Sequence, residues 1–240
     1  MNSVRDYLLS LHQRENGISE DYEISSCPQL IERVQQLGFL PLLDSGIAGF
    51  CAEEMMAPDC HYVQFEDGSW EWPLWTWKGA AINEGNSVYG KFFAGKAGFI
   101  SFKWWPDFYN WRRSKTPELE IGSIEEAIVL TLRERGSMIA RELRAACGFI
   151  GPKMRGKFDA YINRLQMSCY IVTEDFVYPR DKHGREYGFG WSLLTTPENL
   201  YGIQACHTSH SPEESLELMS RHLHTVLPKA TKRQIQRLLK

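Results

Sequence analysis

The chain of 240 residues is 43% hydrophobic and 24% charged, with a formal net charge of −3. These ordinary globular values exclude a disordered chain, and no apolar run is long enough to span a membrane. The first residues combine neither a basic leader nor an uninterrupted apolar stretch, so we expect a cytoplasmic protein without a cleaved secretory signal. Six cysteines occur without a CxxC pair, which favours reduced thiols, and no cofactor is expected.

The first half of the sequence predicts two amphipathic helices, over residues 4–14 and 28–37, with Gly38 ending the second. Short extended runs follow, FLPLL and HYVQF, and we expect strands or an ordered loop in SWEWPLWTW, where tryptophans alternate with polar residues. This half is therefore expected to be α+β.

A glycine-turned hairpin is predicted over residues 88–93 and 96–101, followed by a short helix that carries Trp105, Phe108 and Trp111. Polar groups are interspersed among the aromatic residues of this half and could line a cleft; they are Glu53, Glu54, Glu71, Tyr89, Lys91, Lys96, Arg112 and Arg113. The favoured interpretation is that the tryptophans fill a core and the charged residues lie on the opposite faces.

Two breaks divide the chain into expected segments of residues 1–120, 121–200 and 201–240. The first is the charged, proline-containing RRSKTPE near residue 120, and the second is CHTSHSP before a new helical pattern. Residues 1–120 hold 17 acidic and 10 basic residues, a net charge of −7, whereas residues 121–240 hold 13 and 17, a net charge of +4. Such asymmetry indicates a nucleic-acid contact in the second half, although a solvated surface gives the same count.

The segment from Ser123 to Thr196 has the pattern of a winged helix. Ser123 and Glu126 predict a capping box for its first helix, which Gly136 ends. One stripe of this helix is predicted to be buried: Ile124, Ile128, Thr131 and Leu132. A short strand over residues 137–139 and a second helix over residues 140–147 follow. Gly151 and Pro152 open a third helix, whose apolar residues recur at helical spacing: Met154, Phe158, Tyr161 and Leu165. Two β-rich runs, CYIVTEDFVYP and YGFGWSLLTT, then predict a hairpin that serves as the wing.

A basic face of the third helix and the tip of the wing are the predicted contacts with double-stranded DNA. Lys153, Lys157, Ala160 and Arg164 each lie one residue before an apolar position, and Arg155 is near the same first turn. The wing tip adds Arg180, Lys182, His183 and Arg185. Lysine and arginine neutralise phosphates, and small residues allow a helix to approach a groove closely. The alternative is a protein-interaction scaffold whose basic face is only solvated.

Several segments resemble the family of AlkZ-type (YcaQ-type) bacterial DNA glycosylases, and more closely the shorter AlkZ-related proteins. They are LGFLPLLDSGIAGF, WEWPLW, YGKFFAGKAGFIS, WWPDFYNWRR, KMRGKFDAYINRLQM and YGFGWSLL, which together cover most of the chain. The resemblance implies tandem winged helices that enclose DNA. The glycosylases that the chain resembles remove alkylated bases or unhook crosslinks, and they use a QxQ or QxD motif for this chemistry.

The positions that match this motif carry Pro41 and Leu43 in this chain. Neither side chain can position water or stabilise a positively charged sugar, so the catalytic device of the family is missing and the catalytic residues are unknown. Asp44 lies one residue beyond, and an acidic residue before SGIAG is typical of a turn. We therefore expect DNA binding without standard glycosylase catalysis. A glycosylase that uses another acidic residue remains the alternative.

The last segment is predicted to end in a basic helix, whose role has two interpretations. ATKRQIQRLLK predicts a helix capped by Thr231, and its basic residues either extend a nucleic-acid surface or complement the C-terminal end of the helix. Cys206 and the neighbouring histidines have no spacing typical of a zinc site, so no metal is expected there.

Overall fold

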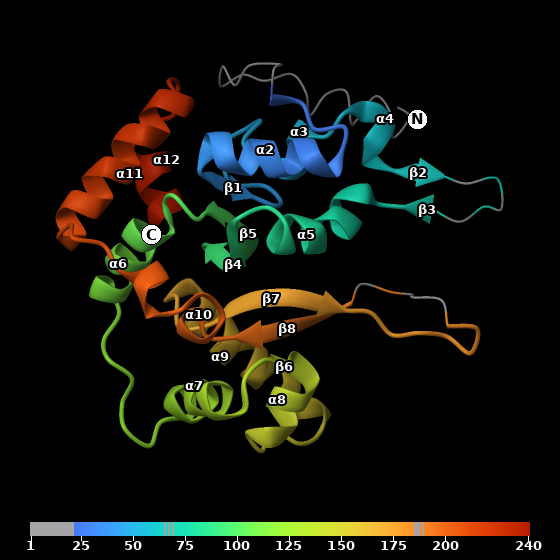
Figure 1. Ribbon diagram of the computed structural model, residues 1–240, viewed down its shortest axis with the longest axis vertical. Helices are drawn as coiled ribbons and strands as arrows, with labels where there is room; N and C mark the ends of the chain where they lie inside the picture. The colour runs from blue at the N-terminus through green and yellow to red at the C-terminus, as the bar shows by residue number, and fades with distance from the viewer. Residues whose placement is uncertain (1–21, 65, 67, 69, 185–187, 189) are drawn as a thin grey trace.

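The computed structural model describes residues 22–240 except for 65, 67, 69, 185–187 and 189 (Figure 1). Within this part of the chain, six strands form one antiparallel sheet in the order β1-β5-β4-β7-β8-β6. The bounds are β1 (Phe39–Pro41), β4 (Ser87–Phe93), β5 (Lys96–Ser101), β6 (Met138–Ile139), β7 (Val172–Val177) and β8 (Trp191–Thr195). The first and second halves of the chain meet in this sheet, where Tyr89 of β4 pairs with Thr173 of β7. The chain is therefore a mixed α+β protein.

Helix α2 (Cys27–Leu37) begins and ends close to where the sequence predicts. The Ser26 hydroxyl accepts a hydrogen bond from the backbone N–H of Gln29, and Gly38 ends the helix with φ of 77°. This left-handed conformation favours glycine because it has no Cβ. The hairpin of β4 and β5 and the aromatic helix α6 (Trp105–Lys115) are confirmed as well. The helix predicted over residues 4–14 lies outside the described residues.

The tryptophan-rich segment differs from the prediction of strands or an ordered loop. The strand β3 contains only Trp70–Glu71, which pair with β2 (Val63–Gln64). Helix α5 (Pro73–Asn83) then begins at a proline, which is suited to the first turn of a helix. The alternation that indicated a strand therefore covers only a two-residue strand and the N-cap of α5. The short helices α3 (Ala52–Met55) and α4 (Pro58–His61) had not been predicted either.

The second half follows the predicted order of elements: α7 (Ile124–Arg135), β6, α8 (Ala140–Ala146), the 3-10 turn η2 (Pro152–Met154), α9 (Arg155–Met167) and the β7–β8 hairpin. The Ser123 hydroxyl accepts from the backbone N–H of Glu126 at 3.1 Å. The Glu126 carboxylate accepts from Gly122 instead of from Ser123, so the predicted capping box forms on one side only. Gly136 ends α7 with φ of 76°.

Apolar side chains form two separate buried clusters. The smaller surrounds α9 and contains Ile128, Val129, Leu132, Leu143, Phe149, Phe158, Ile162, Leu165, Tyr170, Ile171 and Leu194. Ile124, which the sequence placed in this core, is instead 43% exposed. The larger cluster fills the first half and includes apolar residues of α11 (Pro212–Val226) and α12 (Lys232–Leu239).

The C-terminal helices pack on the first half of the chain, where Figure 1 shows α11 and α12 beside α6. The buried carboxylate of Asp107 on α6 accepts from the Ser215 hydroxyl at 2.7 Å and lies 2.8 Å from Nδ1 of His210. The connection from β8 runs through α10 (Pro197–Tyr201) and the 3-10 turn η3 (Ile203–Cys206). Among the described residues, no helix has both the length and the apolar character needed to cross a membrane.

Candidate nucleic-acid interface

Helix α9 is held on two sides and open on a third. Phe158, Ile162 and Leu165 are buried in the smaller cluster. The buried side chain of Gln166 accepts from the backbone N–H of Lys91 on β4 at 2.7 Å, which attaches the helix to the first half. The residues predicted to form the basic face are all exposed: Lys153 on the 3-10 turn η2 that precedes α9, and Lys157, Ala160 and Arg164 on α9 itself. A rigid helix therefore presents this face to solvent.

The cations of this face differ in how free they are to bind an anion. Within the described residues, Lys153 and Lys157 form no ion pair, and the exposed Arg155 lies 3.9 Å from Asp159. Arg164 donates to the Glu125 carboxylate at 2.6 Å, in a pair whose arginine is half exposed. Exposed pairs of this kind contribute about 0 to 1 kcal/mol, so a phosphate can compete with Glu125 for the guanidinium.

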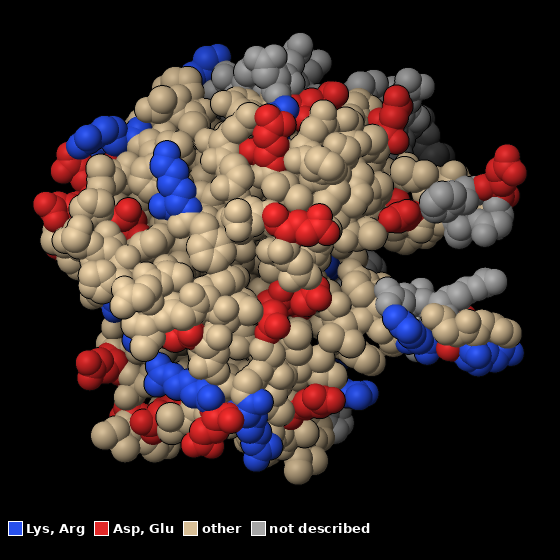
Figure 2. Space-filling model, viewed as in Figure 1, with Lys and Arg blue, Asp and Glu red and all other residues tan. Residues whose placement is uncertain are grey.

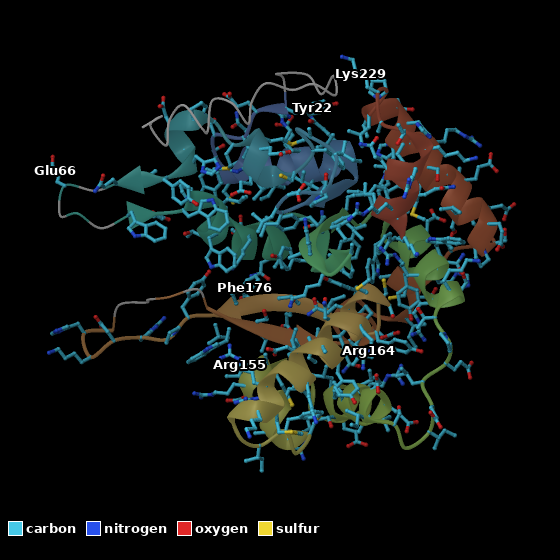
Figure 3. The ribbon with its side chains drawn as sticks, turned by 180° about the vertical axis from the view of Figure 1, so that it is seen from behind. Tyr22, Glu66, Arg155, Arg164, Phe176 and Lys229 are labelled. Carbon is cyan, nitrogen blue, oxygen red and sulfur yellow. The ribbon has the colours of Figure 1, made fainter. Side chains whose placement is uncertain are left out.

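The wing projects from the side of the molecule where α9 begins. In Figure 3, Arg155 marks the end of α9 nearer to the projecting β7–β8 hairpin, and Arg164 marks the far end. Arg180, Lys182 and His183 of the wing are all exposed, and the backbone N–H of His183 is held by Asp181. Figure 2 shows lysine and arginine side chains on the lower of two projecting fingers. Arg185 lies outside the described residues.

The base of the wing contains a contact that the sequence did not single out. The guanidinium of Arg141, on α8, lies over the ring of Trp191 with 4.9 Å to the centroid. Trp191 and Val177 are large apolar residues that remain more than a third exposed there. The interaction of a cation with a ring face holds α8 against the hairpin. The alternating pattern of the hairpin strands was the only sequence signal for this position.

The positions that match the family's catalytic motif carry no reactive group. Pro41 is buried in β1, where it pairs with Gly98, and Leu43 is 36% exposed. Asp44 accepts from the backbone N–H of Gly46 at 2.9 Å and from Nζ of Lys96 at 2.8 Å. The hydrogen bond from Lys96 lowers the pKa of Asp44 below its usual value. The hydrogen bond from Gly46, two residues on, is the contact that a turn-forming aspartate makes with its own backbone.

The other polar groups of the first half are mostly integrated into its structure. Arg112 is buried and donates to the carbonyl oxygens of Phe92, Met167 and Lys240. Tyr89 is buried as well, and Glu71 accepts from Thr76 at 2.8 Å. Among the described residues, no group of three or more histidines, cysteines and carboxylates is placed to hold a metal.

Lys78 is the most unusual cation of the first half. It is fully buried on α5, with Nζ 3.0 Å from the centroid of the Trp75 ring and 3.8 Å from that of Phe176. Its ammonium makes no hydrogen bond to a described residue, and burial lowers its pKa to about 7. Nothing in the sequence distinguished this lysine from a solvated one.

The structure thus defines a mixed α+β protein in which one antiparallel sheet supports an exposed basic helix and an adjacent hairpin. The chain belongs to the AlkZ-related family, because the family model described as AlkZ related matches residues 24–240. No curated protein and no solved structure matches the chain.

Proposed function

We propose that the chain binds double-stranded DNA through a winged helix formed by residues 121–200, flanked by segments 1–120 and 201–240. In this proposal α9 docks in a groove of the duplex and the β7–β8 hairpin is the wing. The order of elements supports it, as does the β7-β8-β6 order of strands beside three helices. The observation that carries the proposal is the exposed basic face formed by Lys153 on η2 with Lys157 and Arg164 on α9.

The charges of this surface determine how strongly binding should depend on salt. About four to six phosphates would be contacted by six cations: Lys153 on η2, Arg155, Lys157 and Arg164 on α9, and Arg180 and Lys182 on the wing. Each neutralised phosphate contributes about −0.9 to the slope of log K against log salt, because condensed counterions are released. The affinity should therefore fall by about 10² to 10³ between 50 and 200 mM salt.

We further propose that this chain binds DNA without the standard base-excising chemistry of the glycosylases it resembles. Excision needs a polar group that positions water and stabilises the sugar cation, and Pro41 and Leu43 supply none. Both carboxylate oxygens of Asp44 accept hydrogen bonds within the protein. The chain would then bind DNA in the context of repair, and the proposal names no particular DNA sequence or lesion.

The second candidate function is excision of an alkylated or crosslinked base by a non-standard acidic residue. One observation favours it, namely that Asp44 has a lowered pKa and its side chain is 73% exposed beside the motif positions. The test is release of free base from a panel of alkylated and crosslinked duplexes. Base release that is lost in Asp44→Ala would establish excision, whereas no release from the panel would exclude it for those lesions.

The test of DNA binding compares two double variants with the same change in charge. Lys153→Glu with Lys157→Glu should weaken binding to duplexes of unrelated sequence at least tenfold and reduce the salt slope by about two. Lys103→Glu with Lys229→Glu is the control, since both lysines are exposed and Figure 3 places Lys229 far from α9. Absent or salt-independent binding by the wild type would contradict the proposal and favour the protein scaffold.

A further inference from the structure

The last helix, α12, has one buried and one basic face. Ile235, Leu238 and Leu239 are buried in the larger cluster. On the opposite side, Arg233, Arg237 and Lys240 are exposed, at spacings of four and three residues that place them in one stripe. Within the described residues none of the three forms an ion pair. Three cations are therefore aligned along a helix that the core holds in place, and one of them, Arg237, also interacts electrostatically with Asp44.

Hydrogen bonds with α6 and with the loop after β1 fix the position of α12, and the bond with the loop is donated by the Gln234 amide to the carbonyl oxygen of Gly46 at 3.5 Å. Trp111 donates its indole N–H to the carbonyl oxygen of Leu239 at 3.1 Å, and the buried Arg112 donates to that of Lys240. A reciprocal capping box of Thr231 and Gln234 closes the start of the helix. The basic stripe is consequently preorganised, which reduces the conformational entropy lost when an anion binds.

Two adjoining cavities open along this stripe. The first, of about 730 Å³, lies between α12 and the loop Ser45–Ile47, with Arg233, Arg237 and Lys240 in its wall. The second, of about 530 Å³, shares Met167, Gln236 and Lys240 with the first and adds Lys115. Neither wall contains an aspartate or a glutamate. The combined groove is therefore positively charged and large enough for more than a single phosphate group.

The groove is continuous with the exposed face of α9. Met167 lines both cavities and is the last residue of α9. At about 100° per residue, Met167 lies about 20° from Ala160 and about 60° from Arg164 around the axis of α9, on its exposed side. The face proposed to dock on DNA thus leads into the groove of α12.

We propose that this α12 groove binds the sugar–phosphate backbone of the DNA that α9 contacts, and so forms a second contact region beyond the winged helix. The inference rests on the proposed DNA binding. Arginine offers paired N–H donors that match phosphate oxygens, and Arg233 and Arg237 both lie in the wall of this groove. Continuity with α9 favours a polymer backbone over a free phosphate compound.

The test is the salt dependence of duplex binding by Arg233→Ala with Arg237→Ala in the full chain. Loss of two phosphate contacts should reduce the magnitude of the slope of log K against log salt by about 1.8. Lys103→Ala with Lys229→Ala is the matched control and should leave the slope unchanged. Both arginines are exposed, so the thermal unfolding midpoint should be unaltered, which separates lost contacts from lost folding.

The outcomes distinguish this inference from the proposed function. Weaker binding in the α9 variants alone would overturn the role of α12 and leave the winged-helix proposal intact. Weaker binding in the α12 variants alone would support the groove and contradict the role of α9. Titration with inorganic pyrophosphate identifies a small-anion site: pyrophosphate binding that is lost in Arg233→Ala with Arg237→Ala, without any duplex binding, would overturn the backbone assignment.

Discussion

Cations have opposite surroundings in the two clusters of this protein. In the first half, Lys78 and Arg112 are buried among rings and carbonyl oxygens. In the second half, Lys153 on η2 and Lys157 on α9 are exposed to solvent. Arg112 replaces its lost hydration with hydrogen bonds to carbonyl oxygens, and burial lowers the pKa of Lys78, whereas an exposed cation keeps its charge available to a ligand. The difference shows that the burial of a lysine or arginine, more than its residue type, separates structural cations from cations available for binding in this protein.

The strongest test of this comparison is removal of the buried guanidinium of Arg112. Arg112→Ala should lower the free energy of unfolding by about 3 kcal/mol or more, because three carbonyl oxygens lose their donor and a cavity opens. Urea unfolding measures the change. A loss below about 1 kcal/mol would show that water replaces the side chain easily and that its burial is incidental.

The second test is the pH dependence of stability caused by Lys78. Its pKa is lowered to about 7 when folded, so between pH 7 and about 10 the unfolded chain binds more protons than the folded one. The free energy of unfolding should therefore rise with pH in this window, by about 2 to 3 kcal/mol relative to the variant Lys78→Met. Parallel stability curves for the two proteins would contradict a buried, neutral Lys78.

An effect of intermediate size on the free energy of unfolding is expected at the start of α7, which packs in the smaller cluster. Ser123→Ala removes the side-chain acceptor for the N–H of Glu126 and should lower the free energy of unfolding by about 1 kcal/mol. Ser123→Asp keeps an acceptor and should retain stability close to that of the wild type. Equal losses in both variants would show that the cap is unimportant.

The smallest effect on stability is expected from the exposed lysines. Lys153→Glu with Lys157→Glu should change the free energy of unfolding by less than about 0.5 kcal/mol, since neither side chain is packed or paired. Chemical unfolding of the purified variant checks this. A large loss would place these lysines with Arg112 as structural groups and would remove the contrast between the two halves.

Local signals predicted the second half well. Ser123, Gly136 and the apolar spacing of α9 act within a few residues of each other, so the sequence contains them directly. The exposed face of α9 followed from the same periodicity. The prediction of Ile124 as a core residue was wrong because a helical stripe does not reveal where the neighbouring elements end.

Long-range contacts could not be predicted. The carbonyl oxygens that accept from Arg112 are 20, 55 and 128 residues away in the sequence. Lys78 lies against Phe176 from the other half of the chain. The groove of α12 also depends on contacts between residues far apart in the sequence, because Ser45, Met167 and Arg237 come together only in the folded protein. The helix α5 was missed because the alternation of Trp70 and Trp72 with polar residues resembled a strand.

The most direct test of the central proposal is to measure which lysines a DNA duplex covers. Amine-specific modification of the full chain, with and without duplex, can be quantified for each lysine by mass spectrometry. The account predicts that DNA protects Lys153, Lys157 and Lys182, while the equally exposed Lys103 and Lys229 react as before. Unchanged modification of Lys153 and Lys157 in a saturated complex would contradict it.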